Sequence, residues 1–147
     1  MASELLKRSE VREEDTWKTS DMYENTGAWE NELKEISALV DKAAAFEGKA
    51  AENADNLFVV LETLAKAGEK IEKAFNYAER LFDEDQTNTT HQAMSAKVYS
   101  LYAAMGSKTA FADPEIIAAS DETLEAFYKE LPALELYRKQ IAEIRRM

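Results

Sequence analysis

Apolar side chains recur at intervals of three and four residues from position 29 onward, the spacing that places them on one face of an α-helix. The first run predicts a helix over about 27–47, and Gly48 offers a glycine C-cap directly after it. Its apolar stripe is Trp29, Leu33, Ile36, Val40 and Ala43, widened by Leu39 and Phe46.

The second run is longer and predicts a helix over about 55–83, capped by Asn53 or Asp55. Its stripe alternates steps of four and three for nearly four heptads: Leu57, Leu61, Leu64, Gly68, Ile71, Phe75, Ala78 and Phe82. A glycine costs about 1 kcal/mol relative to alanine inside a helix, yet Gly68 lies in this stripe. We therefore expect another backbone to approach closely at Gly68, or the helix to kink mildly there.

A polar segment over 83–88 interrupts the pattern before a third helix begins. Asn88 or Thr89 can cap this helix, which we expect to run to about Ala112. Its apolar stripe is Met94, Val98, Leu101 and Met105. The second and third helices therefore predict an antiparallel hairpin.

Shorter helices follow the hairpin. Asp113 and Pro114 predict a cap and a proline at the first helical position of a short turn over about 114–119. Ser120-Asp121 then caps another helix that reaches about Tyr128.

The last predicted helix begins at Leu131-Pro132 and carries Tyr137, Ile141 and Ile144. Helical periodicity still continues at Met147, with no glycine, proline or polar tail to close it. We therefore expect the chain to be interrupted within a helix.

Residues 1–25 are polar and irregular, and they predict an extended N-terminal arm with Trp17, Met22 and Tyr23 as its main apolar anchors. Residues 26–147 predict a single helical domain. The expected fold class is all-α, an antiparallel helical bundle or array of about five to six helices around a long central helical hairpin.

Some apolar residues lie off the predicted stripes. Val59, Tyr77 and Leu81 project from the opposite side of the second helix, and Tyr99 lies away from the stripe of the third. Either another layer of this chain covers them, or they form a docking surface for a partner or a missing domain. The sequence leaves both interpretations open.

Charge and composition narrow the function. The 147 residues include 29 acidic and 18 basic side chains, give a net charge of -11, and contain no cysteine. The acidic excess repels phosphate, so we expect no nucleic-acid partner and no anionic-membrane partner. No run approaches the roughly 18 apolar residues of a membrane span, and residues 1–8 lack the apolar centre of a signal peptide. We therefore predict a soluble, cytoplasmic protein without disulfides.

His91 is the one histidine in the chain. A helix-borne zinc peptidase site needs two histidines one turn apart and a glutamate that activates water. The position of His91 in the first turn of the third helix predicts an exposed or cap-region role instead.

The run Asp83-x-Asp85-x-Thr87 resembles the start of a calcium loop. However, Asn88 replaces the required glycine and Met94 replaces the bidentate glutamate. We therefore predict a solvated turn, and no catalytic, cofactor-binding or metal-binding residue anywhere in this chain.

Short landmarks follow one another along essentially the whole chain. They are Lys7-Arg8-Ser9-Glu10-Val11, Asp15-Thr16-Trp17, Trp29, Phe46-Glu47-Gly48-Lys49, Tyr77-Ala78, Asp83-Glu84-Asp85, Phe111, Pro114-Glu115, Leu136-Tyr137-Arg138 and Ile141 to Arg146. In their order and spacing, from the opening residues to the last helix, these landmarks resemble the N-terminal helical domain of the oligoendopeptidase F family.

The resemblance implies a larger zinc metallopeptidase of the thimet-oligopeptidase-like superfamily, with its zinc ligands in a catalytic domain that this chain lacks. It implies that this chain is a non-catalytic domain, truncated before the catalytic domain, and that it forms part of a wall or lid of the peptide channel. The implied partners are the missing catalytic domain and short peptides in the parent enzyme. On its own, the chain would have no enzyme activity and no cofactor, and its exposed face would favour self-association. The alternative is a stand-alone helical protein-interaction module of the same ancestry.

Overall fold

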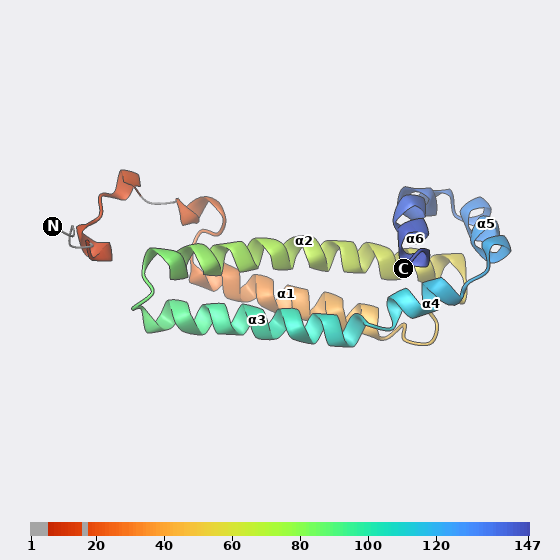
Figure 1. Cartoon of the computed structure of the whole chain (residues 1–147), viewed down its shortest axis with the longest axis horizontal. Coiled ribbons are helices and arrows are strands. Elements are labelled where there is room, and N and C mark those ends of the chain that lie inside the picture. Colours follow the sequence, from red (N-terminus) through yellow and green to blue (C-terminus); the bar gives the residue numbers. More distant parts are fainter. Residues whose placement is uncertain (1–5, 16–17) are drawn as a thin grey trace.

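The computed structural model describes residues 6–15 and 18–147, and no strand occurs among them. Three long helices form an elongated antiparallel bundle, and shorter helices gather at one of its ends (Figure 1). The all-α fold and the central hairpin are therefore confirmed. The bundle consists of α1 (Thr26–Ala44), α2 (Ala54–Glu84) and α3 (Thr89–Thr109), and the end group consists of α4 (Ala112–Ala118), α5 (Asp121–Glu130), the 3-10 helix η4 (Pro132–Tyr137) and α6 (Arg138–Arg145).

Helix α1 begins where the side chain of Asn25 accepts a hydrogen bond from the backbone N–H of Ala28 at 2.9 Å. It ends at Ala44, so the predicted extension to residue 47 and the C-cap role of Gly48 are wrong. Gly48 instead lies in the following loop with a φ of 82°, a conformation that glycine adopts without a steric penalty.

The loop after α1 is tied to α4 by one carboxylate. The two side-chain oxygens of Glu115 accept hydrogen bonds from the backbone N–H groups of Gly48 at 3.0 Å and Ala50 at 3.1 Å. This contact satisfies two loop donors and connects the bundle to the end group. Sequence patterns did not indicate it, because the partners are more than sixty residues apart.

Helix α2 begins after Asn53, whose side chain accepts from the backbone N–H of Asn56 at 2.8 Å. Its buried positions change face along its length. The first set packs on the end group, the second packs on α1 and α3, and the two sets are about 100° apart around the helix at 3.6 residues per turn. The first set is Ala54, Leu57 and Leu61, and the second is Ala67, Ile71, Ala74 and Ala78.

The single apolar stripe predicted along α2 runs between these two faces. The prediction that one stripe is buried along the whole helix is therefore wrong. Gly68, Phe75 and Phe82 are only partly buried. A Cβ atom added at Gly68 would have no neighbouring atom within 4 Å. The expected close backbone approach at this glycine is therefore absent.

The bundle core centres on Trp29, which is fully buried and donates a hydrogen bond from its indole Nε1 to the backbone carbonyl of Ala74 at 2.9 Å. Tyr77 packs between Trp29, at 6.5 Å between ring centroids, and Tyr23, at 5.1 Å. Another layer of the same chain therefore covers Tyr77, as the first interpretation of the off-stripe residues proposed.

The N-terminal segment docks through Met22 and Tyr23, which pack against this core. Its described residues include three single-turn 3-10 helices, Arg8–Glu10, Glu13–Asp15 and Thr19–Asp21. Trp17, the other predicted anchor, lies outside the described residues. Arg8 forms an ion pair with Glu84 at 3.3 Å, which accounts for a carboxylate near the C-terminus of α2.

Asn88 caps α3, because its side chain accepts hydrogen bonds from the backbone N–H groups of Thr90 and His91. The predicted start of the next helix is wrong. Helix α4 begins at Ala112, two residues before Pro114, and the preceding residue keeps a helical backbone. Proline is tolerated here because the first N–H groups of a helix need no intrahelical partner.

The end group has its own core around the first turns of α2. Ser120 caps α5 by accepting from the backbone N–H of Thr123 at 3.1 Å, as predicted. The chain after Leu131 differs from the prediction, since six residues form η4 before α6 begins at Arg138. The buried members of this core are Ala54, Leu57, Leu61, Ile116, Leu124, Phe127, Tyr128, Leu134 and Ile141.

Replacing Glu115 tests the link between the loop and α4. Glu115→Ala removes both acceptors and is expected to lower the free energy of unfolding by about 1–3 kcal/mol, because hydrogen bonds to a charged acceptor are lost. Glu115→Gln keeps one acceptor oxygen and should cost less. Urea denaturation of the unsubstituted protein and the two variants gives the order of their stabilities. Equal stability of all three would contradict the proposed link.

Tyr23 supplies a pH-dependent test of the core. Burial, with a smaller contribution from the Glu32 charge, raises the pKa of Tyr23 from 10.0 to about 12. The unfolded chain therefore loses this proton at lower pH than the folded chain, so the Tyr23 contribution to stability falls as pH rises from 10 to 12. The buried Tyr23 hydroxyl also has no hydrogen-bond partner among the described residues.

Tyr23→Phe is consequently expected to be nearly neutral or mildly stabilising at pH 8, and increasingly stabilising relative to the unsubstituted protein above pH 10. Denaturant titrations of both proteins across this range give the comparison. A constant difference between pH 8 and pH 12 would show that the tyrosine titrates as in the unfolded chain.

Candidate functional site

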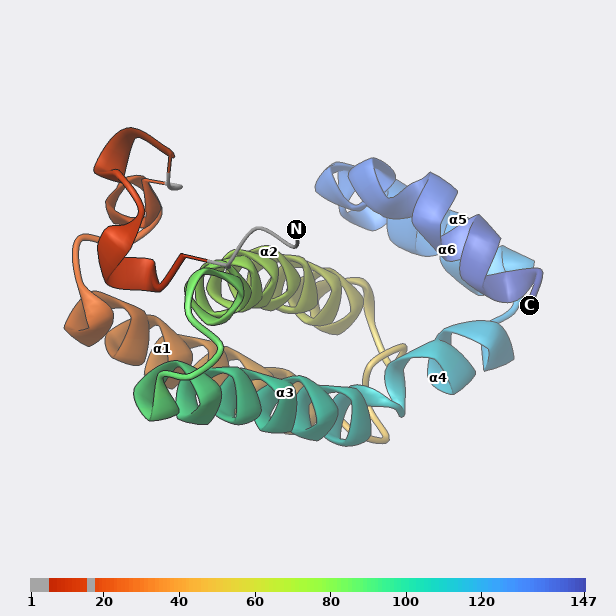
Figure 2. The same cartoon turned by 60° about the vertical axis from the view of Figure 1, so that its left-hand side comes forward.

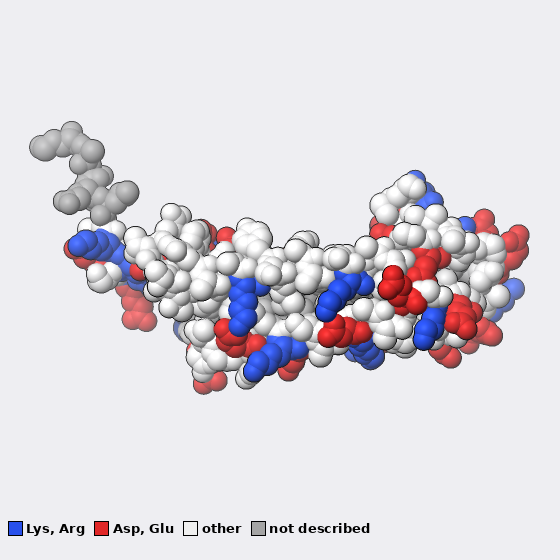
Figure 3. All heavy atoms as spheres, turned by 90° about the horizontal axis from the view of Figure 1, so that it is seen from below, with Lys and Arg blue, Asp and Glu red and all other residues white. Residues whose placement is uncertain are grey.

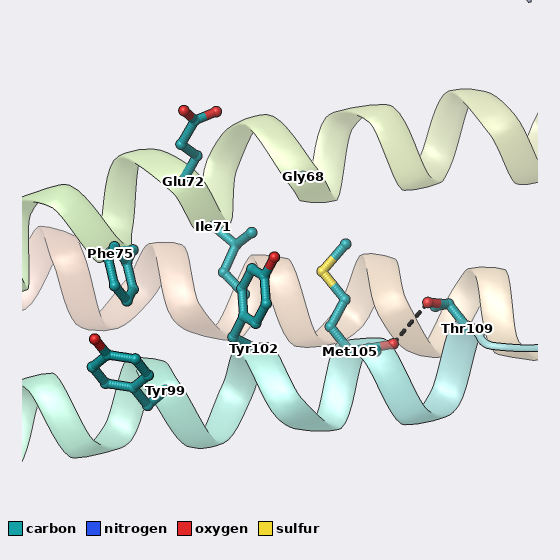
Figure 4. A pocket seen from close by; sticks show the side chains of 9 residues that line it. Gly68, Ile71, Glu72, Phe75, Tyr99, Tyr102, Met105 and Thr109 are labelled. Atoms are coloured by element: carbon teal, nitrogen blue, oxygen red, sulfur yellow. Dashed lines mark hydrogen bonds between the residues drawn. The ribbon is translucent and has the colours of Figure 1, made fainter. Parts of the chain in front are cut away.

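A largely apolar hollow lies between α2 and α3 on the described surface, and we call it the α2–α3 groove. It encloses about 580 Å³ (Figure 4). Four positions of α2 and five of α3 line it. These are Gly68, Ile71, Glu72 and Phe75 on α2, and Tyr99, Tyr102, Met105, Gly106 and Thr109 on α3.

The groove opens on the side of the α2–α3 pair that faces away from α1, which lies behind the two helices in Figure 4. Helices α5 and α6 project on the side of α2 opposite α1, as Figure 2 shows.

Aromatic side chains form the walls of the groove. Phe75 and Tyr99 meet edge to face with 5.0 Å between their ring centroids, which joins α2 to α3 and fixes the ring of Tyr99. Tyr99 is nevertheless 53% exposed and Tyr102 is 61% exposed. Aromatic side chains such as these are enriched in binding interfaces.

Two glycines create the space between the walls. A Cβ atom added to Gly68 or to Gly106 would find no atom within 4 Å. Neither residue has a positive φ, so the backbone conformation does not demand glycine at either position. The pair therefore leaves an opening that ordinary side chains could fill, and each glycine makes its helix less stable than alanine would.

The charges of α3 are directed away from the groove. Its two lysines, Lys97 and Lys108, form ion pairs with Glu30 and Asp41 of α1. Three of these four residues, Glu30, Asp41 and Lys97, border a second, more polar hollow between α1 and α3. The α3 wall of the α2–α3 groove is left without a charged side chain.

Glu72 is the one charged residue that lines the groove, and its side chain makes no ion pair or hydrogen bond with the described residues. Neighbouring cations are engaged elsewhere. Lys70 binds Glu32 at 3.1 Å and Glu35 at 3.3 Å, and these hydrogen bonds raise the pKa of Lys70. Lys73 lies over the ring of Tyr23 at 4.5 Å.

Sequence reasoning identified only part of this groove. It singled out Tyr99 as an off-stripe residue, and it placed Phe75, Met105 and Gly68 on core stripes. It missed Glu72, Tyr102, Gly106 and Thr109. The available signal was the composition of α3, which has few charged residues in a chain that is otherwise rich in them.

His91 lies in the first turn of α3, as predicted, and is half-buried. In the preceding turn, Asp85 accepts hydrogen bonds from the hydroxyl and the backbone N–H of Thr87, and the hydroxyl contact chiefly lowers the pKa of Asp85. Over residues 6–15 and 18–147, no three or more His, Cys, Asp or Glu side chains come together in a group that could hold a metal ion.

Acidic and basic side chains are interspersed on the face in Figure 3, without a continuous basic stripe on that face. In the part of the chain that the structure describes, no helix has both the length and the apolar character needed to cross a membrane.

The chain is thus a helical array with an open apolar groove, and comparisons with known proteins relate it to one class of enzyme. Oligopeptidase PepF of Bacillus subtilis is 34% identical over 143 residues, which are 97% of this chain and 21% of the relative. Group B oligopeptidase PepB of Streptococcus agalactiae is 28% identical over 130 residues, which are 88% of this chain and 22% of the relative. No family model matches the chain.

Solved structures agree with the sequence comparison. Oligoendopeptidase-F from Enterococcus faecium aligns with a TM-score of 0.72 and 26% identity over 82% of this chain and 24% of that one. A Chlamydophila abortus protein shares the fold with a TM-score of 0.81 and 24% identity over 97% of this chain and 24% of its own.

The homologues of this chain are therefore oligoendopeptidase F proteins and related oligopeptidases. The chain matches part of these enzymes and spans about one-fifth of the length of the relatives. The predicted resemblance is confirmed.

The two groove glycines provide a stability test. Gly68→Ala and Gly106→Ala are each expected to raise the free energy of unfolding by about 0.5–1 kcal/mol, because alanine favours the helix and meets no neighbouring atom. Chemical denaturation of each variant measures the change.

Gly48→Ala is the matched control, because the positive φ at position 48 disfavours alanine even though space is available. This variant should lose stability. Destabilisation by Gly106→Ala as large as that by Gly48→Ala would show that the groove is not open as described.

Proposed function

We propose that this chain is the non-catalytic N-terminal domain of an oligoendopeptidase F-like zinc metallopeptidase, and that it forms part of the wall or lid of the channel through which short peptides reach the catalytic domain. The main support is the match to oligopeptidases along 97% of this chain but only 21% of the relative. The chemistry and its zinc ion belong to the remainder of the parent enzyme.

The two connected cores of the chain support its proposed role as a rigid channel wall. The bundle core and the end-group core both use α2, and Glu115 ties the loop after α1 to α4. A continuous packed scaffold of this kind resists deformation, so it can hold an opening at a fixed width. A channel with such a wall admits extended short peptides and excludes folded proteins by size.

We also propose the partners that follow from this role. The catalytic domain of the parent would be the intramolecular partner, and short peptides would be the ligands. In the absence of the catalytic domain, the exposed tyrosines of α3 would favour self-association. The parent would act in the cytoplasm, and the chain by itself would have no peptidase activity.

A chimera tests the proposal. The region of Bacillus subtilis oligopeptidase PepF that aligns with this chain would be replaced by this chain. The chimera is expected to cleave a quenched peptide of about nine residues with kcat/KM within about tenfold of the intact enzyme, a loss of less than about 1.4 kcal/mol in transition-state stabilisation. It should leave a folded protein substrate uncut.

The matched controls are the same enzyme with the aligned region deleted, and the 147-residue chain alone with added zinc. We expect the deletion to lose activity or size selection, and the isolated chain to show no turnover. Chelator-sensitive cleavage by the isolated chain would contradict a non-catalytic role. An unstable or inactive chimera would favour the stand-alone interaction module.

A further inference from the structure

We infer that the α2–α3 groove is a peptide subsite, which accepts an apolar or aromatic side chain and places Glu72 beside a basic neighbour in the same peptide. The inference deepens the proposed function and rests on it, because it names the class of peptide that this wall would favour. Four features of the groove support it: its length, its apolar hollow, its free hydroxyl groups and its unpaired carboxylate.

The length of the groove fits a short extended peptide. The lining residues run from Gly68 to Phe75 on α2 and from Tyr99 to Thr109 on α3, about 10 Å and about 15 Å along the two helix axes. An extended chain rises about 3.3 Å per residue, so the groove spans about three to five peptide residues. A partner helix needs a longer continuous face to bury its apolar stripe.

The hollow itself suits one large apolar side chain. Tyr102 and Met105 stand on α3, Phe75 stands on α2, and the missing side chains of Gly68 and Gly106 leave room between the walls. A ring inserted there would gain aromatic contacts and remove apolar surface from water. Methionine beside the opening can adjust its shape to different side chains.

The tyrosine hydroxyls can orient the peptide backbone. No hydrogen bond from the side chain of Tyr99 or Tyr102 occurs with the described residues. Each hydroxyl can donate to a peptide carbonyl or accept from a peptide N–H. By contrast, the hydroxyl of Thr109 already donates to the backbone carbonyl of Met105 at 2.7 Å.

Charge selects the neighbouring residue of the peptide. Glu72 lacks an ion partner, the lysines near it on α2 bind elsewhere, and the chain carries a net charge of -11. A peptide with arginine or lysine next to its aromatic residue would place a cation beside this carboxylate. The overall field would also attract cationic peptides before contact.

An NMR titration of the ¹⁵N-labelled 147-residue chain tests the inference directly. The probe is the peptide acetyl-Gly-Phe-Arg-Gly-amide, and the comparison peptides replace its phenylalanine with alanine or its arginine with glutamine. We expect weak, saturable binding with a Kd of about 0.1–1 mM, as suits a small contact. The amide shifts should concentrate on α2 near Gly68 and Glu72 and on α3 from Tyr99 to Thr109.

Variants of the chain then test the two proposed contacts separately, the apolar contact in the hollow and the ion pair with Glu72. Gly106→Leu fills the hollow and should weaken binding by at least about tenfold, as expected for a central contact. Ser107→Leu is the matched control, because it adds the same side chain to the adjacent exposed position of α3, which does not line the groove. Its affinity should equal that of the unsubstituted chain.

Glu72→Gln should weaken the arginine peptide by about two- to fivefold, the range expected for an exposed ion pair, and should leave the glutamine peptide unchanged. Circular dichroism and denaturant titration of each variant establish that a loss of affinity is not a loss of fold. The Gly106→Leu variant is expected to be at least as stable as the unsubstituted chain.

Three results would overturn the inference. These are no saturable binding, shifts that map to another surface, or equal binding by the Gly106→Leu and Ser107→Leu variants. Groove shifts that depend on protein concentration without peptide would instead show that a second copy occupies the groove. In each of these cases, an active and size-selective chimera would still support the proposed function. An inactive chimera together with peptide binding in the groove would contradict the role as a channel wall but support the groove as a peptide-binding site.

Discussion

Helix α2 has to serve two cores, and the rest of the molecule depends on how it does so. Its first turns bury Leu57 and Leu61 in the end group, while its later turns bury Ile71 and Ala74 in the bundle. These faces are about 100° apart around the helix. The hydrogen bond from Trp29 to the carbonyl of Ala74 fixes α1 against the second face. The angle between the faces directs α1 and the end group to different sides of α2.

The α2–α3 groove follows from this arrangement. Because α1 covers one side of the α2–α3 pair and the end group covers only the first turns of α2, a stretch of both helices on the other side has no covering layer (Figures 1 and 2). Gly68 and Gly106 deepen it, and Phe75 with Tyr99 keeps its walls in contact. The off-stripe residues thus differ in their surroundings, since Tyr77 is covered within the chain and Tyr99 is left exposed.

The sequence predicted the fold because local signals were strong. The apolar spacing predicted the three long helices, and the caps at Asn53, Asn88 and Ser120 agreed with the structure. Errors arose where distant contacts decide the outcome. Gly48 lies in a loop that hydrogen bonds to Glu115 hold in place. Gly68 borders the space between α2 and α3, and the sequence pattern of α2 alone does not show where α3 packs. The groove was missed for the same reason, because each helix contributes only half of it.

The proposed role as a channel wall is tested most directly by photo-crosslinking in the peptidase chimera. A benzophenone amino acid would replace Tyr102 in the groove or, as the control, Ala38 in the hollow between α1 and α3, and an uncleavable cationic aromatic peptide would be added. We predict that the probe at position 102 captures the peptide and that the probe at position 38 does not. Capture at position 38 alone, or capture of only the catalytic domain at position 102, would contradict a peptide-facing α2–α3 groove.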